Sequence, residues 1–288
     1  MLSLKNIKKI LIPTDFSDTA MKAAQYAAEM AKKSGGGIFL LHVIEPDIDS
    51  IRQPYPLHDR LQEEIANNRL GELNILQKSI NQMYPDIKTE IELAKGTITN
   101  SVLDFAESNK MDLIVMGTKG ATGLKEIFMG SVTAGTIRRT KVPVLAIPEE
   151  YVFDLPDAIL FATNHFEKNT NLLNKIVEVA TLFSADVHVA VFVDTDTVEV
   201  SDYVHNTQQL NHYLDFLKKT YPSIVFKAEL LEGSEFEETV EKYDVKNEVD
   251  MIAMITYPKR FLDRLMKKSV TKKMAFHSKI PVLVIPAK

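Results

Sequence analysis

The 288-residue sequence contains no cysteine. Disulfide bonds, thiolate metal sites and cysteine nucleophiles are therefore excluded. The sequence also lacks any apolar run approaching the roughly 20 residues that a membrane helix needs. Residues Met1–Lys9 contain scattered lysines and no apolar core of signal-peptide length. We therefore expect a cytoplasmic protein that does not enter a membrane.

An excess of positive charge is missing as well. The formal net charge is −5 at pH 7, so no basic face is expected that could displace the counterions of a nucleic acid. Hydrophobic residues make up 45% and charged residues 25% of the chain, which is typical of a globular protein and not of a disordered one. The length allows one large domain or two ordinary ones.

Three common catalytic and nucleotide-binding motifs are absent from the sequence. There is no Gly-x4-Gly-Lys-Ser/Thr loop, no Gly-x-Gly-x2-Gly and no Gly-x-Ser-x-Gly. The sequence therefore does not predict a P-loop, a dinucleotide-binding fingerprint or a hydrolase nucleophile elbow, and we assign no catalytic residue and no protein metal site.

What the sequence does contain is an internal repeat. The segment Ile10–Asp15 reappears as Ile159–Asn164, and Val142–Pro148 reappears as Ile280–Pro286. The matches occur in the same order in both halves. Two copies of one domain follow.

Each copy alternates strands and helices at a spacing that predicts a parallel sheet covered on both faces. We expect two tandem doubly wound α/β domains, 1–150 and 151–288, each with a five-stranded parallel sheet flanked by helices in a Rossmann-like arrangement. In the first copy the expected strands cover residues 10–13, 38–43, 88–93, 113–116 and 142–147, and the expected helices cover residues 18–33, 58–83, 98–109 and 131–140.

Several local signals support these boundaries. Ser17 is a suitable N-cap for an alanine-rich helix, and Gly35–Gly37 is suited to end that helix in the left-handed conformation. The helix expected over 58–83 has its apolar positions on one stripe. That stripe consists of Leu61, Ile65, Leu73, Leu76 and Ile80.

Open parallel sheets bind ligands beyond the carboxyl ends of their strands, where the strand order reverses. Here that point lies between the first and fourth strands, which are followed by Thr14-Asp15 and by Gly117-Thr118-Lys119-Gly120. Four of the eleven glycines fall within fourteen residues, and Ser131 then opens a helix. Bare backbone amides and a helix N-terminus together favour binding of a phosphate group, and the hydroxyls of Ser131 and Thr133 could add further donors.

Other interpretations of these residues remain open. Asp15, which is acceptor-only when ionised, suits a ligand amino or hydroxyl group, but Asp is also favoured in turns and helix entries. Val43 and Met116 are apolar residues at strand ends that can simply belong to the core. His42 is interpreted as a satisfied core histidine, and Lys119 is equally natural as a solvated loop lysine.

The spacing Gly117-x2-Gly120-x9-Gly130-Ser131, with Pro13 and Asp15 upstream, resembles the nucleotide-binding signature of the universal stress protein family. The resemblance covers nearly the whole chain in the tandem two-domain form. It implies binding of an adenine nucleotide, ATP or AMP/ADP, and a regulatory role in stress response.

Residue by residue, the resemblance implies contacts along the whole ligand. Asp15 and Val43 would hold the adenine end, and the phosphate chain would meet the start of the last helix. A Mg²⁺ ion commonly bridges such phosphates, although no carboxylate pair marks its site. The implied ligand-binding residues are Pro13, Thr14, Asp15, Val43, Met116, Gly117, Thr118, Lys119, Gly120, Gly130, Ser131, Val132 and Thr133.

The second copy departs from this pattern. Its aligned residues carry side chains where the first copy has bare backbone, and of the Gly-x2-Gly-x9-Gly-Ser signature only the serine, Ser269, is kept. We therefore hypothesise that the second domain keeps the fold but has lost nucleotide binding. The replacements are Asn164 for Asp15, Phe192 for Val43, Ile255 for Gly117, Pro258 for Gly120 and Lys268 for Gly130.

Two other functions remain as alternatives. The chain could be an ATP-dependent enzyme with slow hydrolase activity, or an interaction scaffold that binds no nucleotide. The last strands, Val142–Ile147 and Val282–Ile285, should lie at sheet edges that seek a partner. We therefore expect the two domains to pair through them, and the resemblance suggests further assembly into a homodimer.

Overall fold

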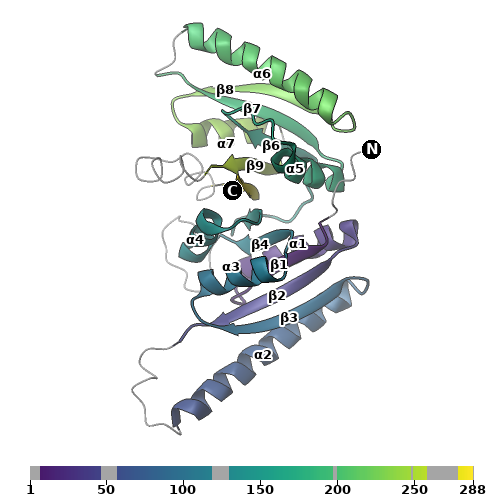
Figure 1. Ribbon diagram of the computed structural model, residues 1–288, viewed down its shortest axis with the longest axis vertical. Coiled ribbons are helices and arrows are strands. Elements are labelled where there is room, and N and C mark those ends of the chain that lie inside the picture. Colours follow the sequence, from purple (N-terminus) through teal and green to yellow (C-terminus); the bar gives the residue numbers. More distant parts are fainter. Residues whose placement is uncertain are drawn as a thin grey trace. The chain divides into compact units, whose positions relative to one another are not determined.

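The computed structural model describes residues 7–46, 57–118, 130–196, 200–247, 249–257 and 278–287. The chain divides into two units, shown in Figure 1. The N-terminal unit comprises Ile7–Glu126 and Gly130–Val142, and the C-terminal unit contains Pro143–Lys288.

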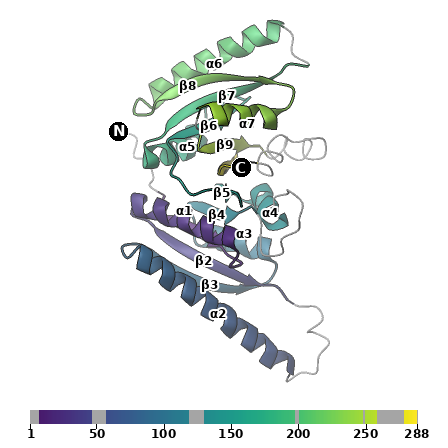
Figure 2. The ribbon, with the colours of Figure 1, turned by 180° about the vertical axis from the view of Figure 1, so that it is seen from behind.

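The N-terminal unit is built on four parallel strands in the spatial order β3-β2-β1-β4. Right-handed crossovers place α1 and α2 on one face of this sheet and α3 and α4 on the other. Helices α3 and α4 contact each other and lie in front of the strands in Figure 1, whereas the reverse view in Figure 2 brings α1 forward. The strand order therefore reverses between β1 and β4, as the sequence predicts. The elements are β1 (Lys9–Pro13), α1 (Asp18–Ser34), β2 (Gly37–Ile44), α2 (Leu57–Met83), β3 (Lys88–Lys95), α3 (Ile98–Ser108), β4 (Leu113–Gly117) and α4 (Ser131–Arg139).

Local sequence signals explain where α1 begins and ends. The Ala20 backbone N–H donates to Ser17 Oγ at 3.2 Å, which makes Ser17 the predicted N-cap. Gly35 follows the helix with φ 61°, the left-handed conformation that glycine adopts without a Cβ penalty. The small side chains on the buried face let α1 pack closely on the sheet. These buried residues include Ala20, Ala23, Ala24, Ala27, Ala28 and Ala31.

The apolar stripe predicted for α2 is buried only in its second half. Leu73, Leu76 and Ile80 are buried, and α2 packs against β2 and β3. Ile65, however, is 37% exposed, so the stripe is only partly covered by the sheet. A helix of 27 residues is about 40 Å long. It overhangs a strand of eight residues, which spans about 26 Å.

The C-terminal unit contains five parallel strands in the order β10-β9-β6-β7-β8. Strand β5, from the end of the first sequence repeat, joins this unit and pairs antiparallel with β10. Helix α5 packs on β6 and β10, α6 on β7 and β8, and α7 on β8. The elements are β5 (Val144–Ile147), β6 (Ala158–Ala162), α5 (Thr170–Phe183), β7 (Asp186–Asp194), α6 (Val200–Thr220), β8 (Phe226–Gly233), α7 (Phe236–Asn247), β9 (Met251–Thr256) and β10 (Val282–Pro286).

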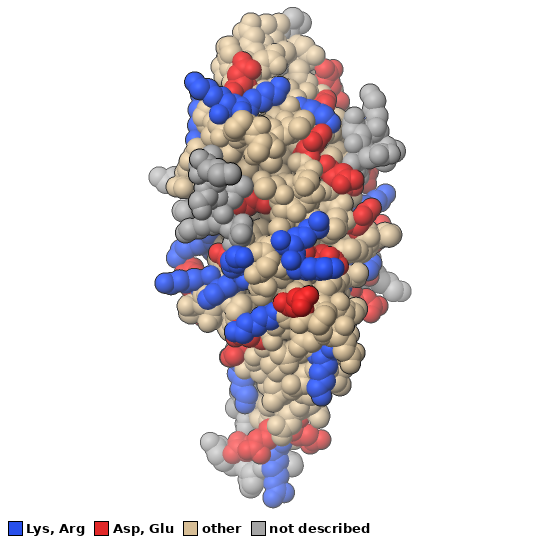
Figure 3. Space-filling model, turned by 90° about the vertical axis from the view of Figure 1, so that its right-hand side faces the viewer, with Lys and Arg blue, Asp and Glu red and all other residues tan. Residues whose placement is uncertain are grey.

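The predicted fold class is confirmed: mostly parallel sheets are flanked by helices. Three expectations stay predictions. They are the domain boundary at residue 150, the pairing of the two domains with each other and the formation of a homodimer. None of the helices in the described ranges is long and apolar enough to cross a lipid bilayer. On the face shown in Figure 3, Lys and Arg side chains are interspersed with Asp and Glu and do not form a single basic patch.

Candidate functional site

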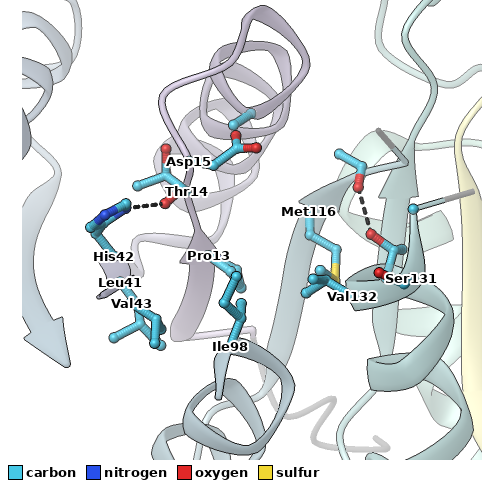
Figure 4. Close-up of a pocket in the computed structure, with 14 residues that line it drawn as sticks. Pro13, Thr14, Asp15, Leu41, His42, Val43, Ile98, Met116, Ser131 and Val132 are labelled. Atoms are coloured by element: carbon cyan, nitrogen blue, oxygen red, sulfur yellow. Dashed lines mark hydrogen bonds between the residues drawn. The ribbon is translucent and has the colours of Figure 1, made fainter. Parts of the chain in front are cut away.

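A cavity of about 270 Å³ opens in the N-terminal unit at the carboxyl ends of β1, β2 and β4, beside the start of α4. Figure 4 shows side chains from these elements around it. Ten of the thirteen residues predicted from the sequence line this cavity. They are Pro13, Thr14, Asp15, Val43, Met116, Gly117, Gly130, Ser131, Val132 and Thr133.

The other three predicted residues have different outcomes. Thr118 is buried and is not among the described residues that line the cavity. Its carbonyl oxygen accepts a hydrogen bond from the Gly130 N–H at 2.6 Å, so it fixes the start of α4. Lys119 and Gly120 lie outside the described residues.

Sequence reasoning missed four residues of the cavity wall: Ala20, Leu41, His42 and Ile98. Leu41 and His42 directly precede the predicted Val43, so the carboxyl end of β2 was itself a usable signal. Ile98 begins α3, just after β3, and belongs to the same edge of the sheet. His42 was interpreted as a core histidine, and the structure places it in the wall instead.

The turn after β1 positions Asp15. Asp15 Oδ1 accepts hydrogen bonds from the Ser17 backbone N–H at 3.1 Å and from Ser17 Oγ at 2.6 Å. Thr14 Oγ1 accepts from the Phe16 N–H at 3.1 Å, and Phe16 adopts φ 64°. The helix-entry role of Asp15 is therefore confirmed. The same bonds hold its carboxylate at the cavity, where an acceptor would meet a ligand amino group.

The opposite side of the cavity is the N-terminus of α4. Gly130 is the N-cap and makes no side-chain capping bond. The first backbone N–H groups of a helix have no partner within it and carry partial positive charge. The residues that supply them, Ser131 to Thr133, line the cavity. This end is suited to an anion.

The hydroxyl groups of this first turn differ from the prediction. The Thr133 hydroxyl donates to the Gly117 carbonyl at 2.7 Å, and Thr133 is buried. Its proton is therefore committed to joining α4 to β4, and the expectation that it serves as a ligand donor is wrong for this structure. Ser131 is exposed at the cavity and retains that role as a prediction.

The structure gives Gly117 a packing role that the sequence did not reveal. A Cβ atom at this position would stand 2.7 Å from Thr19 Cγ2 and 3.2 Å from the Thr19 carbonyl carbon. Any larger residue would push the first turn of α1 away from β4. Glycine is thus required here by the approach of α1, in addition to any need for backbone access to a ligand.

The equivalent region of the C-terminal unit is arranged differently. The Tyr257 hydroxyl, after β9, donates to Glu167 Oε2 in the loop after β6, and the Tyr213 hydroxyl donates to the Glu167 carbonyl at 2.6 Å. Burial, followed by the bond to Glu167 and its charge, raises the pKa of Tyr257, so its phenol stays a donor. The ring of His165 meets Tyr257 edge-on at 5.3 Å. This network joins the ends of the first and fourth strands of that unit.

Three of the five predicted replacements in the second repeat can be located. Asn164 follows β6, Phe192 lies in β7 and Ile255 lies in β9, at the strand ends expected for them. Pro258 and Lys268 lie outside the described residues, as does Ser269. Within the described ranges, no group of three or more His, Cys, Asp or Glu residues is placed to hold a metal ion.

Comparison with known proteins identifies the family. A model of the universal stress protein family matches residues 6–148 and again residues 156–286. The chain belongs to the universal stress protein family. The double match confirms the tandem form predicted from the glycine spacing and the repeat.

Individual relatives agree with this assignment. Universal stress protein MJ0531 of Methanocaldococcus jannaschii is 34% identical over 145 residues, which are 49% of this chain and 81% of that protein. Universal stress protein Slr1230 of Synechocystis is 25% identical over 299 residues and covers 96% of this chain and 99% of its own length. A universal stress protein from Archaeoglobus fulgidus has the same fold, with a TM-score of 0.74 at 20% identity, over 97% of this chain and 98% of its own.

Proposed function

We propose that the N-terminal unit binds one adenine nucleotide, ATP or AMP/ADP, in the cavity at the carboxyl ends of its strands. The base lies at Asp15 and Val43, and the phosphates lie at the first turn of α4. The C-terminal unit keeps the fold and binds no nucleotide.

One observation carries this proposal: a single cavity joins an acceptor-rich end to a donor-rich end. The carboxylate of Asp15 lies at one side and the first turn of α4 at the other. A nucleotide has the complementary pattern, with amino groups on the base and negative oxygens on the phosphates. Membership of the universal stress protein family supports the same assignment.

We propose a regulatory role in stress response, in which occupancy of the cavity biases conformation or partner binding. No residue is assigned as a general base, so hydrolysis would be slow and incidental. Any Mg²⁺ ion would be held chiefly by the phosphates of the ligand. A cytoplasmic location and assembly into a homodimer belong to the same proposal.

Calorimetric titration of the purified chain tests the proposal. ATP and AMP should bind to one site, inorganic triphosphate should bind more weakly, and incubation with ATP should release phosphate only slowly. Titration with GTP measures how strongly the site prefers adenine over guanine, a preference that Asp15 is expected to provide. If no adenine nucleotide binds, the alternative of an interaction scaffold is favoured. If phosphate is released rapidly, the alternative of an ATP-dependent enzyme is favoured.

A further inference from the structure

His42 makes a contact in the cavity wall that the proposed function does not use. Its Nδ1 atom lies 2.8 Å from the Thr14 carbonyl oxygen, drawn as a dashed line in Figure 4. A carbonyl oxygen only accepts, so Nδ1 carries the proton and the imidazole donates. The ring also packs on Phe16, with centroids 4.7 Å apart.

The bond falls where β1 and β2 separate. Their pairing ends with Pro13 opposite Leu41, and the last bond runs from the Thr14 N–H to the Leu41 carbonyl at 2.9 Å. In a parallel ladder one residue longer, the Val43 N–H would donate to the Thr14 carbonyl. The observed register stops before that bond, and His42 takes the carbonyl instead.

The Val43 N–H points toward the cavity side of β2. Successive residues of a strand direct their main-chain groups alternately to its two neighbours. The Ile44 carbonyl accepts from the Gly96 N–H, on the β3 side, and the Leu41 carbonyl accepts on the β1 side. Val43 therefore faces the β1 side, beyond the end of β1, where it lines the cavity.

The C-terminal unit provides an internal comparison. Its pairing also ends one residue before the turn, at Ala162 opposite Ala190, and the Thr163 N–H donates to the Ala190 carbonyl at 2.9 Å. The residue that follows Ala190, in the position of His42, is Val191, which has no side-chain donor. The backbone arrangement is common to both units, and the imidazole bond is a feature of the N-terminal unit.

We propose that His42 is a positioning residue that holds the Thr14 carbonyl away from the Val43 N–H and so keeps the edge of β2 open for the adenine base. The proposal rests on the proposed function for its ligand. The hydrogen bond itself joins two residues of the chain, and it can be tested without any nucleotide.

The first test is amide hydrogen exchange at Val43, followed by NMR in the unliganded chain. The Val43 amide should exchange readily in the native protein and in His42→Asn, whose amide nitrogen can replace Nδ1. In His42→Val, which copies Val191, the Thr14 carbonyl becomes available and exchange should slow by about tenfold or more. Strong protection of Val43 in the native protein, or no change in His42→Val, would overturn the proposal.

The second test is affinity. We expect His42→Val to bind ATP about tenfold more weakly, as for loss of one positioning hydrogen bond, and His42→Asn to recover to within about threefold of the native affinity. Inorganic triphosphate, which lacks the base, should bind all three proteins equally. His212→Val, an exposed histidine of α6, is the matched control.

The outcomes separate the two proposals. If no adenine nucleotide binds the native chain, the proposed function fails, and Val43 exchange still decides the role of His42. Native ATP affinity in His42→Val, or an Asn variant as weak as the Val variant, would overturn the role of His42 while leaving the nucleotide site in place. Thermal unfolding of each variant excludes misfolding as the cause.

Discussion

The two units share a strand order and differ at the carboxyl ends of the strands. In the N-terminal unit the ends of β1 and β4 border an open cavity, and Gly117 leaves space for α1. In the C-terminal unit the corresponding ends are joined by the bond from Tyr257 to Glu167, and both residues line a separate cavity of about 410 Å³. Ile255 stands where Gly117 would be. The two units thus have the same strand order and different residues at the carboxyl ends of their strands.

This difference shows how the fold and the site depend on different residues. The central strands of both units are fully buried, as in Leu113–Met116 and Met251–Met254. Their apolar side chains are sufficient to specify a sheet covered on both faces. The site depends on a few residues beyond those strands, which can change without disturbing the core.

Copying the C-terminal residue into the cavity should have the largest effect. Gly117→Ile places a side chain within 2.7 Å of Thr19 Cγ2 and forces α1 to move. We expect ATP affinity to fall about a hundredfold, equivalent to about 2.7 kcal/mol. The unfolding free energy should fall by about 1–3 kcal/mol from overpacking. Calorimetry and urea unfolding measure the two effects.

A smaller pair of variants serves as control for this prediction. Gly117→Ala alone should weaken ATP binding. Adding Thr19→Ala to that variant removes Thr19 Cγ2, the atom nearest to the new Cβ, and should restore part of the ATP affinity. Native binding by Gly117→Ile would show that the cavity does not depend on close packing of α1.

A lysine at the start of α4 should have the next largest effect. Gly130→Lys copies Lys268 and places a side chain beside the first N–H groups of the helix, so we expect ATP to bind about tenfold more weakly, or about 1.4 kcal/mol. Gly71→Lys adds the same side chain to an exposed position of α2, where nothing lies within 4 Å of the new Cβ. That control should bind ATP normally. Tighter binding by Gly130→Lys would mean that charge attraction outweighs steric exclusion.

The network of the C-terminal unit should affect stability and leave binding unchanged. Tyr257→Phe removes the donor to Glu167 and should lower the unfolding free energy by about 1 kcal/mol. ATP affinity should not change, because the cavity proposed to bind the nucleotide lies in the other unit. Chemical unfolding and calorimetry together check this. A changed ATP affinity in Tyr257→Phe would break the proposed division of roles.

A pH effect in the C-terminal unit should be the smallest. His188 is 5% exposed, its Nδ1 lies 2.9 Å from the Tyr243 hydroxyl, and its buried Nε2 has no hydrogen-bond partner among the described residues. Burial, and then the charge of Lys227, lower the pKa of His188 below its ordinary value of 6.5, against the opposing charges of Glu229 and Asp186.

The sign of this effect follows from proton uptake. Because the unfolded chain takes up the proton more readily, stability should fall as the pH drops through 6.5 and below. His188→Leu should flatten that dependence in urea unfolding curves recorded between pH 5 and 8. An unchanged slope in the variant would assign the pH dependence to other groups.

The fold could be predicted well because its signals are local. Ser17 and Gly35 mark the ends of α1, and the alternation of apolar strands with helices predicts the parallel order. The extent to which α2 is buried did not follow from the sequence. Ile65 continues the apolar pattern, but how far the sheet extends beneath it depends on tertiary structure.

The cavity could be predicted in outline because the carboxyl ends of β1 and β4 meet at a reversal of strand order. The roles of individual side chains were harder to predict. Gly117 is required by Thr19, which is far from it in sequence, and the Thr133 hydroxyl is committed to the Gly117 carbonyl. His42 has an apolar sequence context, and only the three-dimensional position of Thr14 reveals its partner.

The stoichiometry of ATP binding tests the central claim most directly. Calorimetric titration of the intact chain should give one site per chain, and Gly117→Ile should weaken that site about a hundredfold. Two sites per chain, or one site that keeps its native affinity in Gly117→Ile, would contradict the assignment of binding to the N-terminal unit alone.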